Sequence, residues 1–323
     1  MTSPRIALIT PALADANNGN WQTAQRWARL LRPWAQVRLA STWQAADVAR
    51  DEDLLIALHA VKSAPAVAAW RAAWPKPVVL VLTGTDLYGG LDTSAATLAA
   101  ATRLVVLNEL GLAALPAPLR AKAHVCLQSV PARTPLPKPT RHLRAVVVGH
   151  LRACKAPEVV WAAARQLSAD DAVHIDHIGT ALEPALGVAA RDVAAQCPRY
   201  RWLGGLAHAA TRARIQRASV LVHPSWLEGG AHAVIEAITC GTPVLASRID
   251  GNLGLLGTDY DGTFAPGDGA ALAALLRRAR AEPAFMAHLT AQCAARAARF
   301  APAAEQATLR RLLDDCLAEQ GLP

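Results

Sequence analysis

The stretch Ser219–Ser247, SVLVHPSWLEGGAHAVIEAITCGTPVLAS, carries the strongest signals for the fold of this chain. An apolar run, VLV, leads into a polar turn that contains two glycines. A helical pattern follows over 231–239, and a second apolar run, VLAS, ends the stretch. Apolar strands without polar alternation, joined by a helix, are typical of a parallel sheet that is covered on both faces. The stretch therefore predicts one strand–helix–strand unit.

The same alternation extends over nearly the whole chain. Further apolar runs are IALITPAL, VRLAS, DLLIALHA, VVLVLTG, LVVLNE and HVCLQSV in the first part, and RAVVVGH, VHIDHIG and YRWLG in the second. Helical patterns lie between them over 21–31, 66–74, 95–101, 158–167, 185–196 and 209–217, and two more close the chain over 270–280 and 301–319. The pattern predicts an α/β protein with two doubly wound, Rossmann-like domains.

A proline-rich segment interrupts this rhythm. PARTPLPKPTRHLR, which begins at Pro131, contains four prolines and no apolar periodicity. Proline fixes φ and lacks an amide donor, so the segment is predicted to be a domain boundary. We expect domains over 1–138 and 139–300, with the helix of 301–323 crossing back to the first domain. In such sheets ligands bind outside the carboxyl ends of the strands, so we expect the substrate cleft between the two domains.

Composition excludes several classes of protein. The chain has 323 residues, of which 53% are hydrophobic and 18% charged, so it can bury two cores and has no disordered signature. No apolar run reaches the roughly 20 residues that span a bilayer. The first residues, MTSPRIALITPAL, suggest a buried strand rather than a signal peptide. We therefore expect a cytoplasmic protein without stable membrane insertion.

The net charge restricts the class of binding partner, and the cysteine spacing indicates the redox state of the thiols. The formal net charge of +8 implies anionic partners, but the basic residues are scattered, which argues against nucleic acid. The six cysteines are far apart and form no CxxC pair, so we expect reduced thiols. No spacing typical of a metal cluster is visible, and no cofactor is expected.

Two glutamates in the opening stretch indicate a site for a polyol. Glu228 lies in the turn, and Glu236 lies in the helix that follows, with seven residues between them. Gly229 and Gly230 would leave backbone amides near the start of that helix, where phosphate or sugar oxygens bind well. Carboxylates at both ends of such a turn can accept hydrogen bonds from the hydroxyls of a hexose and a ribose.

The segment resembles the glutamate–seven–glutamate motif of retaining, family-4-type glycosyltransferases of the GT-B fold. The landmarks VVVGHLRACKAPE, IGT and WLGGL precede the motif in the expected order, so the resemblance covers the whole second domain. It implies that Glu228 touches the donor sugar, that Glu236 binds the ribose of the nucleotide, and that transfer is independent of metal. The implied fold is GT-B, with two Rossmann-like domains that face each other across a cleft.

The same resemblance assigns the diphosphate clamp to VVVGHLRACKAPE. Arg152 and Lys155 are the candidates for binding the donor diphosphate, together with Gly149 and, in WLGGL, Gly204. Arginine can bind phosphate oxygens in a bidentate manner, and lysine adds a charge that compensates the leaving UDP. In the family an arginine usually follows the glycine directly, whereas His150 stands there in this chain. We expect Arg152, Lys155 and Glu228 to carry the catalysis.

The first domain supplies the candidate acceptor site. The first strand ends in a polar turn, Asn17–Asn20, which leads into a helix; GT-B enzymes place a glycine-rich loop there, facing the donor phosphate. Ser63 is predicted to cap the helix after the third strand, and Lys62 adds a cation. The donor residues expected here are Gly19 and Asn20, and the acceptor residues are Asn17, Asn18, His59, Lys62, Ser63, Thr83, Thr85 and Asp86.

NNGNWQTAQRW and LTGTDLY are similar to one narrower group, the selenosugar synthases of selenoneine biosynthesis. The similarity implies that the sugar of a UDP-sugar, UDP-N-acetylglucosamine or UDP-glucose, is transferred to selenophosphate with formation of a C–Se bond. A selenophosphate selenium is already an anionic nucleophile near neutral pH, so no carboxylate base is required. The implied partners are the UDP-sugar, selenophosphate and, functionally, a selenophosphate synthetase.

Two alternatives stay open. The first is an ordinary family-4-type hexosyltransferase with a hydroxyl acceptor on a lipid, a sugar or a small alcohol. Related transferases often place a histidine near TGTDLY, and this chain has none there. The helix with Trp27, Leu31 and Trp34 could in that case dock on an acidic membrane, although such an apolar stripe more often faces a core. The second alternative is a nucleotide-sugar sensor without catalysis.

Overall fold

The computed structural model describes residues 3–11 and 19–318. They divide into two compact units: unit 1 contains the chain up to Ser129 and again from Ala301, and unit 2 is Val130–Phe300. The proline-rich segment belongs to unit 2, although the sequence placed the boundary at 138–139. The segment is held there by Arg133, whose amide donates to the Thr239 carbonyl at 3.0 Å. The two units are described separately below.

Unit 1 is built on a six-stranded parallel sheet, sheet A, with the order β2-β1-β3-β4-β5-β6. Its central strands are continuous apolar runs such as LLIAL in β3, which is buried along its whole length. The strands are β1 (Arg5–Ile9), β2 (Gln36–Ala40), β3 (Leu54–Leu58), β4 (Val78–Leu82), β5 (Arg103–Val106) and β6 (Ala123–Val125).

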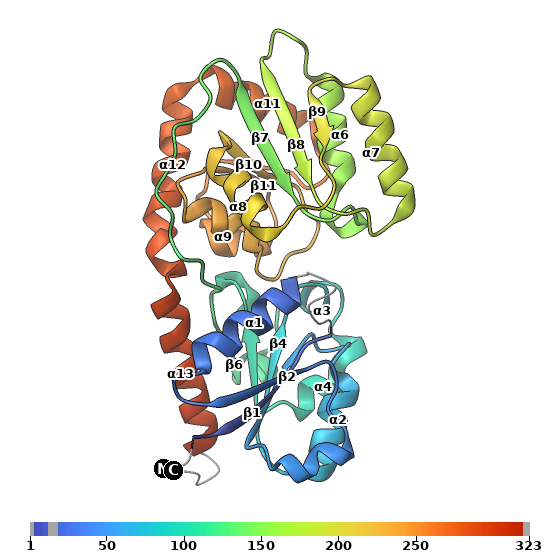
Figure 1. Ribbon diagram of the computed structural model, residues 1–323, viewed down its shortest axis with the longest axis vertical. Coiled ribbons are helices and arrows are strands. Elements are labelled where there is room, and N and C mark those ends of the chain that lie inside the picture. The colour runs from blue at the N-terminus through green and yellow to red at the C-terminus, as the bar shows by residue number, and fades with distance from the viewer. Residues whose placement is uncertain (1–2, 12–18, 319–323) are drawn as a thin grey trace. The chain divides into compact units, whose positions relative to one another are not determined.

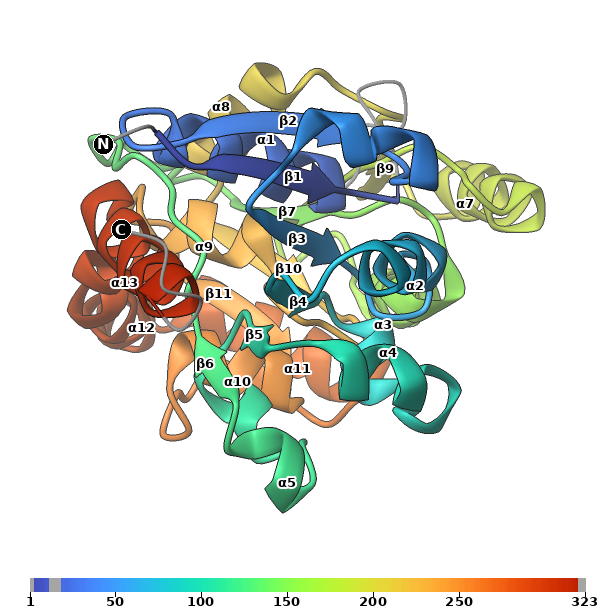
Figure 2. The same cartoon turned by 90° about the horizontal axis from the view of Figure 1, so that it is seen from below.

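Helices cover both faces of sheet A (Figure 2). The last helix, α13, packs against α1 on one face, and α2 packs against α4 on the other. Trp27 and Leu31 of α1 are fully buried in the core that α13 covers. This face of α1 therefore packs on the core, which is the interpretation that the sequence favoured over docking on a membrane. The helices are α1 (Gly19–Leu31), α2 (Ala64–Ala73), α3 (Thr85–Tyr88), α4 (Ala95–Ala100), α5 (Ala117–Arg120) and α13 (Pro302–Ala318), with 3-10 turns η2 (Ala45–Arg50), η3 (Asp92–Ser94) and η4 (Glu109–Leu112).

Unit 2 is built on a second six-stranded parallel sheet, sheet B, with the order β12-β11-β10-β7-β8-β9 (Figure 1). The opening stretch of the sequence forms β10, α9 and β11 at its centre, which confirms the predicted strand–helix–strand unit. The strands are β7 (Leu143–Val148), β8 (Val173–Ile178), β9 (Tyr200–Trp202), β10 (Val220–His223), β11 (Val244–Ser247) and β12 (Thr263–Phe264).

The helices of unit 2 form two groups. On one side α6 packs against α7 and α11, and on the other α9 packs against α8, α10 and α12. This division follows from the strand order: the strands after β7 run toward one edge and those after β10 toward the other, and crossovers between parallel strands are right-handed as a rule. The helices are α6 (Pro157–Gln166), α7 (Pro184–Gln196), α8 (His208–Arg217), α9 (His232–Ile238), α10 (Asp250–Leu256), α11 (Gly269–Ala281) and α12 (Pro283–Ala297), with 3-10 turns η5 (Ala153–Lys155) and η6 (Ala298–Phe300).

Two helices of unit 2 were not predicted. Helix α10, DGNLGLL, contains two glycines, which have low helix propensity, so its sequence gives little sign of a helix. Helix α12 follows α11 after the single residue Glu282, and its alanine-rich sequence has no strong apolar stripe. Both form because tertiary packing against α9 supplies the stabilisation.

The fold class predicted from the sequence, α/β with two Rossmann-like parallel sheets, is confirmed. None of the described helices has both the length and the apolar character needed to cross a membrane. The strand order of sheet B reverses between β7 and β10, and that of sheet A between β1 and β3. The carboxyl ends of strands at such switch points are where open α/β sheets bind ligands.

Candidate active site

The switch point of sheet B brings together a lysine and a glutamate that lie far apart in the sequence. Lys155 ends η5 in the loop after β7, and Glu228 lies in the turn after β10. Lys155 Nζ donates a hydrogen bond to Glu228 Oε1 at 2.5 Å. Two of the three residues predicted to carry catalysis are therefore in direct contact.

Glu228 is buried, with 7% of its surface exposed, and a histidine forms a hydrogen bond with its carboxylate. His223, the last residue of β10, donates from Nε2 to the same Oε1 atom at 2.9 Å. Burial raises the pKa of the Glu228 carboxyl, but the charge of Lys155 and the hydrogen bonds of Lys155 and His223 outweigh it, so the pKa lies well below its usual range. Glu228 is thus a fixed carboxylate, suited to accepting hydrogen bonds from a sugar.

Sequence reasoning missed two residues of this arrangement. His223 stands in the quoted motif, but its partner could be identified only once the turn was placed over β10. Gly251, in the unpredicted helix α10, allows close packing, because a Cβ there would lie 1.9 Å from the Glu228 carbonyl oxygen. A side chain at this position would displace the turn that carries Glu228.

Glu236 lies on α9, one turn from its start, and is the centre of a second polar cluster. His208, the first residue of α8, donates from Nε2 to Glu236 Oε1 at 2.6 Å. Arg212 Nε lies 3.6 Å from that oxygen, and His232 Nε2 lies 3.8 Å from it. The sequence did not single out His208, Arg212 or His232.

This cluster also bears on metal binding. His208, His232 and Glu236 offer ligand atoms that lie within 4.8 Å of one another, which makes them the group of described residues able to hold a metal ion. Arg212 opposes a cation there, because its charge faces the same carboxylate oxygen. A neutral polyol can accept and donate hydrogen bonds in this cluster. The arrangement therefore suits a polyol at least as well as it suits a metal ion.

The candidate phosphate clamp lies beside Lys155. Gly149 follows β7 and packs closely on β8, where a Cβ on Gly179 would lie 1.9 Å from the Gly149 carbonyl oxygen. His150, which replaces the usual arginine, accepts a hydrogen bond from the Thr180 amide through Nδ1 at 3.1 Å. Arg152 is exposed and precedes η5, so its guanidinium is accessible to a ligand.

The glycines of the predicted donor site have different roles. Gly204 has a φ of +67°, which favours glycine, and its carbonyl accepts from the Gly179 amide at 2.8 Å. Gly229 and Gly230 connect Glu228 to α9, which begins at His232. They shape the turn between the two glutamates.

A buried hydrogen-bonded group supports the loop after β7. His177 of β8 contacts the Tyr200 hydroxyl through Nδ1 at 3.0 Å, and Trp161 Nε1 donates to that hydroxyl at 2.9 Å. Burial lowers the pKa of His177 to about 4 and raises the pKa of Tyr200 to about 12. A hydrogen bond of the His177 imidazole to the Gly149 backbone opposes the lowering and joins this group to the loop after β7.

The switch point of sheet A carries the predicted acceptor residues. His59 follows β3 with a φ of +73°, a strained conformation for a residue other than glycine. Its Nε2 atom lies 3.2 Å from Thr85 Oγ1. Burial lowers the pKa of His59, and Lys62 adds to this effect, whereas Asp86 opposes it. The structure thus brings a neutral imidazole and an exposed ammonium to this edge.

Asp86 organises the loops around His59. Its Oδ1 atom accepts from the amides of Thr83 and Gly84 at 2.8 and 3.0 Å, and its Oδ2 atom accepts from the Ala60 amide at 2.8 Å. Asp86 is only 1% exposed. Its carboxylate joins the loop after β4 to the loop after β3.

The expectations for Ser63, Gly19 and Asn20 need revision. Ser63 does not cap α2 with its side chain, because its hydroxyl donates to the Leu58 carbonyl at 2.6 Å and is buried. Gly19 and Asn20 form the first turn of α1 instead of the expected loop. Asn17 and Asn18 lie outside the described residues.

Comparison with known proteins identifies the family. The family model described as "Glycosyl transferases group 1" matches residues 131–298, which is more than half of the chain. The chain belongs to this family. The match covers both candidate clusters of unit 2, around Glu228 and around Glu236. The protein is therefore a group 1 glycosyltransferase, and the resemblance to the family-4 type is confirmed at this level.

Solved structures of the same fold cover nearly the whole chain. One is HepE of Anabaena in complex with UDP and glucose, with 16% identity, a TM-score of 0.78, and coverage of 97% of this chain and all of that one. Another is a sucrose-phosphate synthase from Thermosynechococcus elongatus, with 17% identity, a TM-score of 0.80, and coverage of 98% and 100%. The GT-B fold expected from the sequence is confirmed. The comparison with curated proteins gives no match.

Proposed function

We propose that this glycosyltransferase transfers the sugar of a UDP-sugar, UDP-N-acetylglucosamine or UDP-glucose, to selenophosphate, giving a selenosugar for selenoneine biosynthesis. The observation that carries the donor half is the contact of Lys155 and His223 with one oxygen of Glu228 at the switch point of sheet B. The acceptor half depends on the residues around His59. The alternative is transfer to a hydroxyl acceptor.

The donor assignment follows from charge and position. Lys155 and Arg152 supply cations in the loop after β7, where a diphosphate would lie, and Glu228 supplies hydrogen-bond acceptors for the hexose. Glu236 lies on the neighbouring helix and would accept from the ribose hydroxyls. Among proteins of this fold, HepE has been crystallised with UDP-glucose, which supports a UDP-sugar as the donor.

The acceptor assignment follows from the hydrogen bonds that Asp86 accepts from the backbone. Asp86 is the only carboxylate among the candidate acceptor residues, and backbone amides occupy both of its oxygens. It is therefore poorly placed to deprotonate a hydroxyl. Lys62 and the strained His59 offer an ammonium and hydrogen-bonding nitrogens, which suit an anionic acceptor. Selenophosphate is such an acceptor, because its selenium is an anionic nucleophile before it binds.

The proposed reaction balances without a base. A lone pair on selenium forms the C1–Se bond, while the C1–O bond to the diphosphate breaks and its electrons leave with UDP. The transition state has oxocarbenium character. The main catalytic task is to stabilise the departing diphosphate, which falls to Lys155 and Arg152. Glu228 would orient the sugar.

The test is UDP release from UDP-N-acetylglucosamine and from UDP-glucose, with and without selenophosphate made in place by a selenophosphate synthetase. We expect selenophosphate-dependent UDP and, by mass spectrometry, a selenium-containing sugar. Lys62→Met should raise the KM for selenophosphate about tenfold, which corresponds to one charge-assisted contact, and leave the KM for the donor unchanged. Lys76→Met, the same change at the opposite edge of sheet A, is the control.

Each other outcome identifies an alternative. UDP release that does not depend on selenophosphate would contradict the acceptor assignment, and a screen of hydroxyl acceptors would follow. Binding of UDP without any turnover would favour a nucleotide-sugar sensor. Failure to bind UDP would remove the donor assignment as well.

A further inference from the structure

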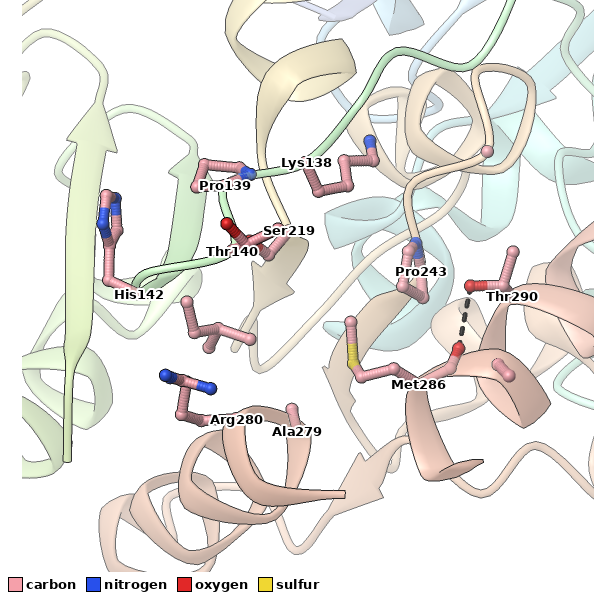
Figure 3. A pocket seen from close by; sticks show the side chains of 13 residues that line it. Lys138, Pro139, Thr140, His142, Ser219, Pro243, Ala279, Arg280, Met286 and Thr290 are labelled. Atoms are coloured by element: carbon pink, nitrogen blue, oxygen red, sulfur yellow. Dashed lines mark hydrogen bonds between the residues drawn. The ribbon is translucent and has the colours of Figure 1, made fainter. Parts of the chain in front are cut away.

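Unit 2 has a cavity of about 360 Å³ at the edge of sheet B opposite the candidate donor site (Figure 3). Leu143 opens β7, and Ser219 and Pro243 directly precede β10 and β11, so all three mark the amino ends of strands. Lys155 and Glu228 follow the carboxyl ends of β7 and β10. The cavity is therefore a separate site, and no role in sugar transfer accounts for it.

The lining of the cavity combines basic and apolar residues. Lys138, His142 and Arg280 are among the residues that line the cavity, and none of the thirteen described lining residues is an aspartate or a glutamate. Pro139, Pro243 and Met286 contribute apolar surface. A cavity of this size and lining suits a small ligand that carries negative charge and a carbon skeleton.

Two of the basic residues are held in position. Lys138 Nζ donates to the Gln216 carbonyl at 2.9 Å and to Thr242 Oγ1 at 2.8 Å, which uses two of its three hydrogens. In Figure 3 the Arg280 guanidinium points toward the side of the cavity that His142 occupies. Arg280 also donates to the Arg141 carbonyl at 3.3 Å, which anchors one end of its guanidinium to the rim.

Positive charge accumulates beside this wall. Arg144 lies 3.3 Å from His142 Nε2 through its terminal nitrogen, and its Nε atom is buried without a hydrogen-bond partner. After burial, the charges of Arg144, Arg280 and Arg199 are what keep the pKa of His142 below its usual value. An anion bound here would relieve this repulsion.

The carboxylate that acts on His142 does not neutralise the cluster. Asp176, which faces His142, is already shared: Arg201 lies 2.6 Å from its Oδ1 atom, and Arg214 lies 3.5 Å from its Oδ2 atom. The arginines whose charges act on His142 therefore outnumber the carboxylates that do so. An excess of fixed positive charge around a cavity is a physical signature of an anion site.

We propose that this cavity is a second anion-binding site, for a small organic phosphate. Arg280 binds the phosphate through paired N–H groups, with His142 beside it, and the surface of Pro139, Pro243 and Met286 contacts the carbon skeleton. A hexose phosphate has a suitable size. The occupant is a ligand other than the donor, because the donor residues lie at the opposite edge of the sheet.

The test is calorimetric titration of the full chain with glucose 6-phosphate and with inorganic phosphate, in the presence of saturating UDP. We expect glucose 6-phosphate to bind, and Arg280→Ala to weaken its binding at least tenfold. Arg278→Ala removes the same charge from the same helix, where the guanidinium lies over Phe285, and should leave the binding unchanged. A crystal soaked in selenate should show an anomalous peak between Arg280 and His142.

Three results would overturn the proposal. The first is that neither phosphate binds under these conditions. The second is that Arg280→Ala binds both phosphates as tightly as wild type does. The third is that only a long polyanion such as heparin binds, with an affinity that falls equally in both arginine variants, because this would indicate a charged surface rather than a site. If UDP itself does not bind, the titration is repeated without it, and the comparison of the two variants still decides the question.

Discussion

Lys155 donates a hydrogen bond to Glu228 across the switch point of sheet B, with 2.5 Å between Nζ and Oε1. The cation assigned to the donor diphosphate is therefore already paired with the carboxylate assigned to the donor sugar. A bound diphosphate must share Lys155 with Glu228 or draw it away. His223, which contacts the same oxygen, keeps Glu228 in place when Lys155 moves.

Replacement of Lys155 tests this arrangement. Lys155→Met should lower kcat/KM for the donor by about 10²- to 10³-fold, because it removes a charge that stabilises the departing diphosphate. The measurement is steady-state UDP release, with Lys76→Met as the charge-matched control. An unchanged kcat/KM would exclude Lys155 from catalysis.

Glu236 is predicted to determine nucleotide affinity. Glu236→Ala should weaken UDP binding about 10- to 100-fold, because charged hydrogen bonds contribute roughly 1.5–3 kcal/mol each. His208→Ala, which removes the hydrogen bond that orients Glu236, should have a smaller effect in the same direction. Calorimetric titration with UDP gives both values, and Glu282→Gln, at the exposed residue between α11 and α12, serves as the control. Equal affinity in Glu236→Ala and in the control would contradict the ribose assignment.

The sequence was sufficient to predict most of the fold. Buried parallel strands such as β3 are continuous apolar runs, so they are visible without tertiary information. Helices α10 and α12 were missed because their local sequences are weak and their stability comes from packing on α9. The local sequence pattern does not predict a helix whose stability comes from packing on neighbouring elements.

The candidate site could be predicted only in part. Glu228, Glu236 and Lys155 belong to motifs of local spacing, so they could be named from the chain alone. Their partners could not be named from the sequence. His223 contacts Glu228 from the end of β10, and His208 contacts Glu236 from another helix, α8. Ser63 shows the opposite failure: its spacing predicts a cap, but a buried carbonyl competes for the hydroxyl.

The pKa of His177 predicts that stability depends on pH. In the folded chain burial lowers this pKa to about 4, against about 6.5 in the unfolded chain, so the unfolded state binds the proton more readily. The stability from the neutral histidine is therefore present above pH 6.5 and is lost as the pH falls toward 4. Between pH 7.5 and 5 the free energy of unfolding should fall by about 2 kcal/mol on this account.

Urea unfolding of wild type and His177→Gln at the two pH values measures this contribution. The variant keeps a polar side chain near Tyr200 and cannot titrate in this range. Its free energy of unfolding should fall by about 2 kcal/mol less than that of wild type over the same interval. Parallel losses in the two proteins would show that His177 does not carry the dependence.

Glu305 is predicted to fix helix α13 to unit 1. It is 2% exposed and accepts hydrogen bonds from Arg26, from Trp27 Nε1 at 2.7 Å, and from both the amide and the hydroxyl of Ser129. Glu305→Ala leaves Arg26 and the indole N–H without their buried partner, so it should destabilise the protein by about 3–5 kcal/mol. Glu305→Gln, which can still accept from Trp27, should cost less.

Thermal unfolding and limited proteolysis distinguish this effect from a general loss of stability. The Glu305 carboxylate joins α13 to α1 and to Ser129, which follows β6. Glu305→Ala should therefore lower the Tm and expose the chain near Ala301 to cleavage before the core of sheet A is cut. Arg310→Ala, on the exposed face of the same helix where it pairs with Asp314, should change neither. If Glu305→Ala and Arg310→Ala behave alike, α13 is held by its apolar contacts with α1, and the buried carboxylate contributes little.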